Sequence, residues 1–110
     1  MQLKVHGKAL AIVEQVRPLM PQIRRHDRSL ADQIRRAASS MVLNIAEGTY
    51  NDAGTARARF HSAAGSANET RSALKVAAAW GYIARERADA VDDRIDEVLK
   101  MLWALASPKK

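Results

Sequence analysis

Apolar side chains recur at alternating steps of three and four residues along four stretches of the chain, the spacing of one face of an α-helix. These stretches cover residues 3–19, 29–48, 55–80 and 84–106. No stretch shows the period of two that is typical of a β-strand. Because the connections between the four helices are short, neighbouring helices should run antiparallel. The pattern therefore predicts an all-α, up-down-up-down four-helix bundle.

A few residues indicate where these helices begin and end. Pro18 is expected to kink or stop the first helix, which leaves residues 22–28 as a polar, basic connection. Ser29 and Asp32 form an S-x-x-D pattern, a weak capping box that favours a helix start at Ser29. Gly48 is expected to end the second helix, since glycine commonly follows the last helical turn.

The composition favours one helical domain over residues 1–110. The 21 alanines, with only five glycines and three prolines, form helix readily. The absence of cysteine excludes disulfides, cysteine-ligated metals and thiol catalysis, and it fits a reducing compartment. No apolar run approaches the ~20 residues of a membrane span, and no secretory signal is recognisable. We therefore expect a cytoplasmic protein with no membrane contact.

Two of the predicted helices carry more apolar side chains than a single bundle core requires. Five apolar residues between Met41 and Ala46 make the second helix apolar on almost every side. Leu99, Trp103 and Ala106 form a second stripe on the fourth helix. In a monomer such stripes would leave an exposed apolar patch, so the pattern favours self-association. The alternative is a monomer with an apolar surface.

The residues do not form a recognisable catalytic or metal-binding arrangement. The three histidines, His6, His26 and His61, lack the helical spacing that presents two imidazoles to one metal ion. The acidic residues between positions 89 and 97 are mixed with arginine and are interpreted as a solvated face. No serine has a recognisable base or oxyanion hole beside it. The sequence thus predicts a protein that is not an enzyme and has no metal or cofactor.

Polar residues inside the apolar helices are interpreted as structural. Asn44 and Glu47 lie three residues apart in the most apolar helix, and Glu69 lies in a stretch of small residues. Buried polar groups are costly unless they are paired, so we expect a hydrogen-bonded network that fixes the helix register. A pair of carboxylates for acid–base chemistry is the alternative. Gly65 is expected to let a neighbouring helix backbone come close.

Basic side chains give the clearest functional signal. Residues 1–60 hold ten basic and five acidic side chains, whereas residues 61–110 hold eight and seven. The candidate phosphate-binding residues are Arg24, Arg25, Arg28, Arg35, Arg36, Arg57 and Arg59. Guanidinium groups suit phosphate because they donate two parallel hydrogen bonds. Without an interleaved aromatic platform or a known recognition motif, binding to RNA or DNA should be backbone-dominated and salt-sensitive. The alternative is a basic surface that has no nucleic-acid partner.

Four short stretches give a family resemblance: residues 33–38 (QIRRAA), 44–48 (NIAEG), 65–69 (GSANE) and 80–83 (WGYI). In this order and spacing they resemble a bacterial family of four-helix bundle proteins, first noticed as open reading frames in intervening sequences of 23S rRNA genes. The resemblance covers nearly the whole chain, and its first two stretches are the specific part. The accessory proteins of diversity-generating retroelements are similar at a greater distance.

The resemblance implies a ring-like homopentamer with a basic surface and no enzymatic activity. For the retroelement branch it also implies nucleic acid and a reverse transcriptase as partners. Asn44, Glu47 and Gly48 match the central motif of the family, and Glu69 matches its third-helix carboxylate. We interpret these four residues as structural. Ala84 departs from the family, because it stands where a polar residue usually caps the fourth helix.

Pattern, charge and resemblance together predict a non-enzymatic homo-oligomer that binds structured RNA or DNA through arginines. The alternative is an oligomeric protein–protein adaptor, which would dock an acidic protein partner and have no physiological nucleic-acid ligand.

Overall fold

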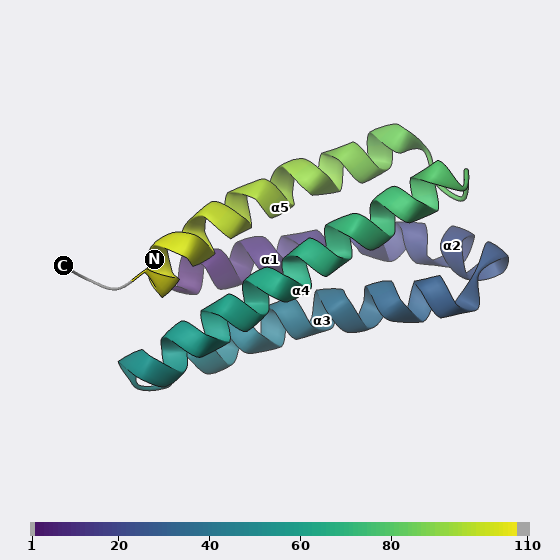
Figure 1. Cartoon of the computed structure of the whole chain (residues 1–110). Coiled ribbons are helices and arrows are strands. Elements are labelled where there is room, and N and C mark those ends of the chain that lie inside the picture. The colour runs from purple at the N-terminus through teal and green to yellow at the C-terminus, as the bar shows by residue number, and fades with distance from the viewer. Residues whose placement is uncertain (1, 108–110) are drawn as a thin grey trace.

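Antiparallel helices make up the computed structural model, which describes residues 2–107 (Figure 1). The helices are α1 (Gln2–Val16), α2 (Met20–His26), α3 (Arg28–Thr49), α4 (Ala53–Ala79) and α5 (Arg85–Ala106). Since α1 and α2 follow one line, they form a single rod, and the four rods run up, down, up and down (Figure 1). The described residues contain no β-strand, and the predicted all-α four-helix bundle is confirmed. None of the described helices is long and apolar enough to cross a membrane.

The first α-helix ends at Val16, two residues before Pro18, as the sequence predicted, but the rod itself continues beyond this point. One 3₁₀ turn, Arg17–Leu19, joins α1 to α2. Pro18 and Pro21 each lie in the first turn of their helical segment, where a missing N–H leaves no helical hydrogen bond unmade. The polar connection predicted over residues 22–28 is therefore wrong. That segment is largely helical, and its Ile23 is fully buried in the core.

A single residue, Asp27, separates α2 from α3 and caps the start of α3. Its backbone is extended, and its carboxylate accepts a hydrogen bond from the Leu30 N–H at 2.9 Å. The predicted capping pair of Ser29 and Asp32 is wrong, because α3 begins before Ser29. The Asp32 carboxylate instead lies 3.8 Å from the Arg35 guanidinium.

The two later connections are also short. The Asp52 carboxylate caps α4 by accepting a hydrogen bond from the Thr55 N–H at 3.0 Å. Gly81, with φ of +82°, lets the chain reverse between α4 and α5. Ala84 precedes α5 in an extended conformation and provides no side-chain cap.

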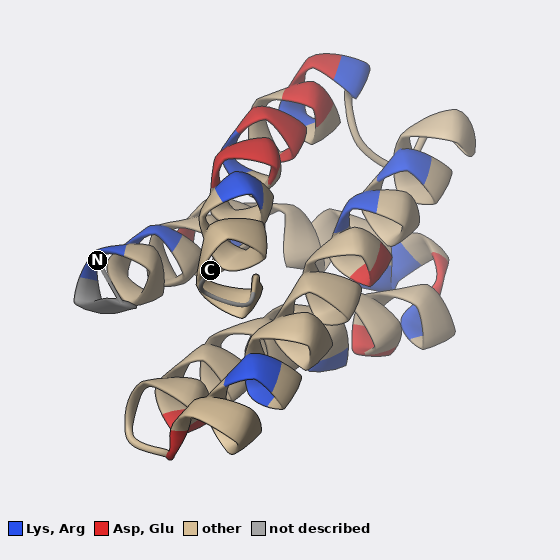
Figure 2. Cartoon of the chain, turned by 60° about the vertical axis from the view of Figure 1, so that its left-hand side comes forward, with Lys and Arg blue, Asp and Glu red and all other residues tan. Residues whose placement is uncertain are grey.

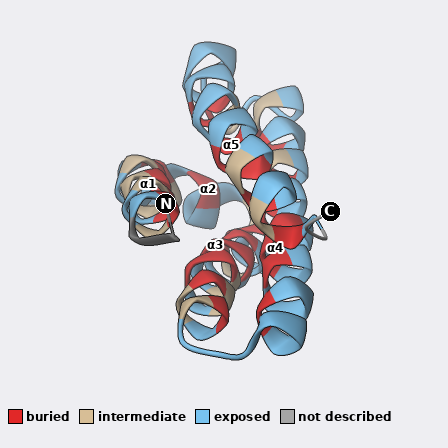
Figure 3. Ribbon diagram, turned by 90° about the vertical axis from the view of Figure 1, so that its left-hand side faces the viewer, coloured by how far each residue is buried: buried red, intermediate tan, exposed pale blue. Residues whose placement is uncertain are grey.

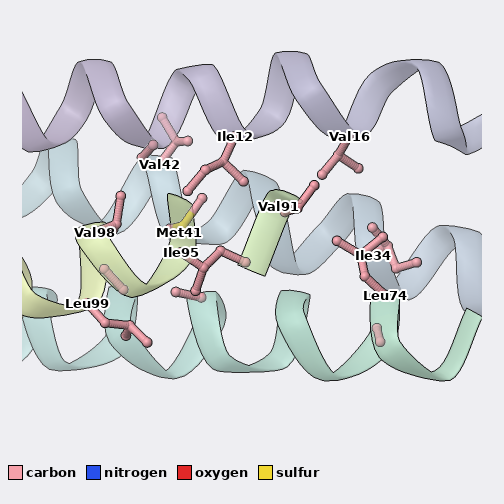
Figure 4. Packing of buried hydrophobic residues seen from close by; sticks show 14 of the residues in the cluster. Ile12, Val16, Ile34, Met41, Val42, Leu74, Val91, Ile95, Val98 and Leu99 are labelled. Carbon is pink, nitrogen blue, oxygen red and sulfur yellow. The ribbon is translucent and has the colours of Figure 1, made fainter. Parts of the chain in front are cut away.

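Apolar side chains from all four rods meet in one core (Figure 3). Figure 4 shows Ile12, Met41, Leu74 and Ile95 directed into the space that the rods enclose. The core side of α4 consists mainly of alanine, with Phe60 as its one aromatic member. Such small side chains allow α3 and α4 to lie close together.

Two glycines have roles other than those predicted. Gly48 does not end its helix, because α3 continues to Thr49, and Gly48 is buried against the ring of Phe60. Gly65 is exposed, and no atom lies within 4 Å of the position that its Cβ would take. The close helix approach expected at Gly65 is therefore wrong, and the close contact lies at Gly48.

Candidate nucleic-acid interface

Arginines line two adjoining grooves on the surface of α3. Arg24 and Arg35 lie in a groove of about 440 Å³ between the first rod and α3. Arg35, Arg36 and Arg59 line a second groove, of about 470 Å³, between α3 and α4. Both grooves contain Arg35 and Ser39, so they are continuous across α3. We call this surface the arginine groove.

Most of the candidate arginines have no acidic partner. Within the described part of the chain, no carboxylate lies within 4.0 Å of the guanidinium groups of Arg24, Arg25, Arg28, Arg36 and Arg57. All five residues are exposed. The contact of Arg35 with Asp32, at 3.8 Å between two exposed groups, contributes little to stability and is easily given up. These guanidinium groups are therefore open to an external anion.

Arg59 differs from the others because it is already held by two residues of α3. The Nε of Arg59 lies 3.1 Å from a carboxylate oxygen of Glu47, and its Nη1 donates a hydrogen bond to Asn44 Oδ1 at 3.5 Å. Asn44 in turn donates to the Ser40 carbonyl oxygen at 2.9 Å. The Ser66 hydroxyl on α4 also donates to the Ser40 hydroxyl, at 2.9 Å. This network joins α3 to α4 on the wall of the arginine groove, whereas the sequence placed it in the core.

The four motif residues do not gather in one place. Asn44 and Glu47 share the network on the groove wall, and Gly48 lies in the core. Glu69 is exposed, and it accepts a long hydrogen bond of 3.4 Å from the Gln33 side chain. The motif therefore spans a surface network, a packing contact and an exposed polar pair.

Nor do the seven arginines form one patch. Arg25 and Arg28 lie at the turn between α2 and α3, beyond the residues that line the grooves. Arg57 precedes Arg59 by two residues, and this spacing turns it about 200° around α4, away from the arginine groove. The structure thus brings together Arg24, Arg35, Arg36 and Arg59 and leaves Arg57 apart.

Acidic side chains gather along α5 (Figure 2), which lies diagonally across the bundle from α3 (Figure 3). Arg71 Nε lies 3.0 Å from an Asp92 oxygen, and a second nitrogen of Arg71 donates to Asp96. That hydrogen bond lowers the pKa of Asp96 below its ordinary value. Glu97 pairs with Lys8 at 2.9 Å, and this hydrogen bond lowers the pKa of Glu97. Carboxylates are thus more numerous on α5 than on α3, whereas Arg24, Arg25, Arg28 and Arg36, on the α2–α3 side, have no carboxylate partner among the described residues.

The sequence did not indicate the apolar residues that accompany these arginines. Val13, Met20 and Pro21 of the first rod line the same groove as Arg24. A third hollow, of about 280 Å³, continues from it and is lined by Leu10, Val13, Ser39, Val42 and Leu43. These residues of the first rod are distant from α3 in the sequence and come next to it only in the folded chain, so local sequence patterns could not predict the groove.

The surplus apolar stripes predicted from the sequence are only partly exposed. Leu99 and Ala106 belong to the core, so that Trp103 is the exposed member of the α5 stripe. On α3, Val42 is buried, whereas Leu43 is 63% exposed. The exposed apolar surface beside the arginine groove therefore centres on Leu43 and Leu10.

The sequence also did not indicate a stack of aromatic rings. The ring centroids of His26 and Tyr82 are 4.9 Å apart, and the two ring planes differ by 3°. His26 is the last residue of α2 and Tyr82 lies in the connection between α4 and α5, so the two are far apart in the sequence. They meet because the α2–α3 and α4–α5 turns lie at the same end of the bundle (Figure 1).

Comparison with known proteins places this geometry in a family. A crystal structure of a protein with unknown function from the S23 ribosomal protein family of Bacteroides thetaiotaomicron aligns with a TM-score of 0.85. The two chains are 22% identical, and the alignment covers 94% of this chain and 99% of the other, so the likeness supports the fold alone. No curated protein matches the sequence. The family described as 23S rRNA-intervening sequence protein matches residues 1–104, which confirms the resemblance seen in the sequence motifs. With nearly its whole length matched, this chain belongs to the 23S rRNA-intervening sequence protein family.

Proposed function

We propose that this chain is a non-enzymatic homo-oligomer that binds structured RNA or DNA through arginine–phosphate contacts. One observation carries the proposal: exposed guanidinium groups without a carboxylate partner, among the described residues, line and extend the arginine groove. An arginine without an ion pair binds phosphate without first losing a favourable contact. Binding by such residues neutralises phosphates and releases counterions, so it weakens steeply as salt rises.

The spacing of the arginines suits a nucleic-acid backbone. Arg28 and Arg35 lie seven residues apart on α3, a rise of about 10 Å along the helix axis. About three base-pair steps of a duplex cover the same length. Arg24, on α2, lies beside this row, because it shares a groove with Arg35. A phosphate backbone that follows α3 would therefore meet basic groups at intervals of a few nucleotides.

Self-association would strengthen such binding. Leu43 is 63% exposed and Leu10 is 43% exposed, and both line the hollow that continues from the arginine groove. Covering these leucines with a second copy would bury apolar surface and join the arginine grooves of neighbouring subunits. A ring of five copies, as the family resemblance implies, would carry five times the formal charge of +6 of one chain.

A second candidate is an adaptor that docks an acidic protein partner. The observation in its favour is the apolar lining of the arginine groove, where Val13, Met20 and Pro21 accompany Arg24. Phosphate gains nothing from contact with apolar side chains, whereas an acidic helix with one apolar face would bury this lining.

A salt series distinguishes the two candidates. Fluorescence anisotropy would measure the binding of a labelled hairpin RNA and a duplex DNA to three proteins. These are the wild type, the variant Arg24→Glu/Arg25→Glu/Arg28→Glu, and the control Lys4→Glu/Arg94→Glu/Lys100→Glu, which has the same net charge. The control positions are exposed and lie on α1 and α5.

We expect the wild type to bind at physiological salt, with an affinity that falls steeply as salt rises. The arginine variant should lose far more affinity than the control. Equal losses in the two variants would reject the assigned residues. Binding that is confined to low salt would reject the nucleic-acid function and favour the adaptor.

A further inference from the structure

Three aromatic side chains form a stack at the end of the bundle where α2 turns into α3 and α4 turns into α5 (Figure 1). Tyr82 is the member that the other two share. Its ring centroid is 4.9 Å from that of His26, with the planes 3° apart. The same centroid is 6.5 Å from that of Trp80, with the planes 16° apart. We call these three residues the aromatic stack.

The backbone fixes the positions from which two members of the stack project. The Trp80 N–H donates to the Val76 carbonyl oxygen at 3.0 Å, and the Tyr82 N–H donates to the Ala77 carbonyl oxygen at 2.9 Å. Gly81, between them, has φ of +82°, a backbone conformation that residues other than glycine rarely adopt. The fixed backbone therefore places the two rings next to each other, and this lowers the cost of ordering them on binding.

The stack is a surface feature and not part of the core. Trp80 is 70% exposed, His26 is exposed and Tyr82 is half-buried. Tryptophan is among the side chains that gain most from burial, so this exposure leaves a large apolar ring face in water. The other tryptophan, Trp103, lies near the opposite end of the bundle, where its ring is tilted by 57° against that of His61.

Arginines lie close in the sequence to the members of the aromatic stack. Arg24, Arg25 and Arg28 come from the segment around the α2–α3 turn, and Arg85 and Arg87 begin α5. All five are exposed. The same two segments carry only two carboxylates, and one of these caps α3. Parallel rings and guanidinium groups therefore occupy the same end of the bundle.

We propose that this end binds an unpaired nucleotide of single-stranded RNA or DNA. The base stacks on Trp80, and the neighbouring phosphates contact Arg24, Arg25 and Arg28. A pairing of exposed aromatic faces with basic groups is the usual means by which proteins hold single-stranded nucleic acid, because every base has a π-face. This inference rests on the proposed nucleic-acid binding, and it adds the unpaired base as the feature that is recognised.

A fully paired duplex does not fit this description. Its bases already stack on each other, so their faces are not open to Trp80, and only its phosphates would reach the arginines. A loop, a bulge or a single-stranded end offers both groups at once. Structured RNA with unpaired positions should therefore bind more tightly than blunt duplex of equal length.

The two tryptophans allow a direct test in the full chain. In a Trp103→Phe background, Trp80 is the sole tryptophan and reports on its own surroundings. Oligoadenylate RNA of eight nucleotides, the matching DNA and a blunt RNA duplex would each be titrated while tryptophan emission and anisotropy are recorded. Affinities would also be measured for Trp80→Ala, Trp80→Phe and the control Trp103→Ala.

We expect both single strands to quench the emission of Trp80 and the duplex to leave it nearly unchanged. Trp80→Ala should lose about 5- to 100-fold in affinity for the single strands, with the duplex affinity retained. Trp80→Phe should keep most of the affinity, because it keeps an aromatic face. Trp103→Ala should bind like the wild type. Since Trp80 is largely exposed, its replacement leaves the core intact.

Three results would overturn the inference. If Trp80→Ala binds the single strands as tightly as the wild type, the aromatic stack does not hold a base. If the wild type binds the duplex alone, the arginines act without the stack, and the proposed function survives while this inference fails. Absence of binding to all three probes would contradict both the proposed function and this inference. Tighter binding of the RNA strand than of the DNA strand would support the site and identify RNA as its ligand, because the two strands differ in the 2′-hydroxyl group.

Discussion

Gly48 of α3 faces the ring of Phe60 on α4, and a Cβ at Gly48 would lie 2.6 Å from Phe60 Cε1. Phe60 is only 2% exposed, so its ring is enclosed by other core residues. The glycine therefore sets how closely α3 and α4 lie at this level of the bundle.

We predict that Gly48→Ala destabilises the protein by up to about 2 kcal/mol. The added methyl group overpacks the contact with Phe60 at a cost of about 1–3 kcal/mol, and the higher helix propensity of alanine offsets at most about 1 kcal/mol of this cost. The midpoint of urea denaturation, followed by circular dichroism, measures the change.

Gly65→Ala is the matched control. It lies inside α4 with nothing within 4 Å of the new methyl group, so it should stabilise the protein by about 0.5–1 kcal/mol. Changes of the same sign in the two variants would contradict the packing role of Gly48.

The start of α5 offers a gain in stability. Ala84 has the extended backbone of an N-cap residue but no side chain that can accept a hydrogen bond. Ala84→Asp should therefore stabilise the protein by about 1 kcal/mol and raise Tm by about 4 °C in a thermal melt.

A control separates capping from the added charge. Ala90→Asp introduces the same side chain at an exposed position inside α5, where no N–H group lacks a partner. It should lower Tm slightly, because aspartate is a poor residue for a helix interior. A rise in Tm for both variants would show that the charge, and not the cap, is responsible.

Acid should weaken the contacts between α5 and its neighbours. Hydrogen bonds from Arg71 and Lys8 lower the pKa of Asp96 and of Glu97, respectively. A carboxylate whose pKa is lower in the folded protein than in the unfolded chain adds stability above the unfolded value, and that stability is lost as pH falls through the folded value. The urea midpoint should therefore be nearly constant from pH 7 to about 5 and decline below about pH 4.

The variant Arg71→Gln tests the cause of the shift at Asp96. In this variant the carboxyl group of Asp96 should titrate closer to its ordinary pKa when followed by carbon-13 NMR. The carboxyl group of Glu97, which pairs with Lys8 instead, should titrate as it does in the wild type. An unchanged titration of Asp96 would show that Arg71 does not lower its pKa.

The helices and most of the core could be predicted from the sequence because both follow from local periodicity. The apolar residues of the first predicted helix recur at steps of four and three residues, and all of them are buried: Val5, Ala9, Ile12, Val16 and Leu19. The end of the first rod could not be predicted in the same way. Proline stops a helix in mid-course but is accommodated in a first turn, and nothing local distinguishes these cases at Pro18.

The candidate site depended more strongly on the fold. Exposed arginines such as Arg36 could be nominated from charge alone, but their grouping into a groove required the position of the first rod. The role of Gly48 depends on Phe60, which lies on the next helix. The aromatic stack joins His26 to Tyr82 across the bundle end, and no spacing in the sequence indicates this contact.

Self-association provides the last prediction, because the leucines beside the arginine groove have no partner in a monomer. Leu43 and Leu10 line one hollow and are largely exposed, so a second copy that covers them would remove apolar surface from water. We expect the wild type to sediment as a multiple of 12.1 kDa. Leu10→Gln/Leu43→Gln should sediment as a monomer with unchanged helical circular dichroism, since neither side chain belongs to the core.

Val76→Gln is the control for that experiment. Val76 is an apolar residue of α4 that is 44% exposed, and it lines neither the arginine groove nor the hollow beside it. This variant should keep the mass of the wild-type assembly. A wild-type protein that sediments at 12.1 kDa, or a double leucine variant that stays assembled while Val76→Gln dissociates, would contradict this interface. In the second case the α4 face, and not the arginine groove, would be the contact between subunits, and the groove would remain open to its ligand in every copy.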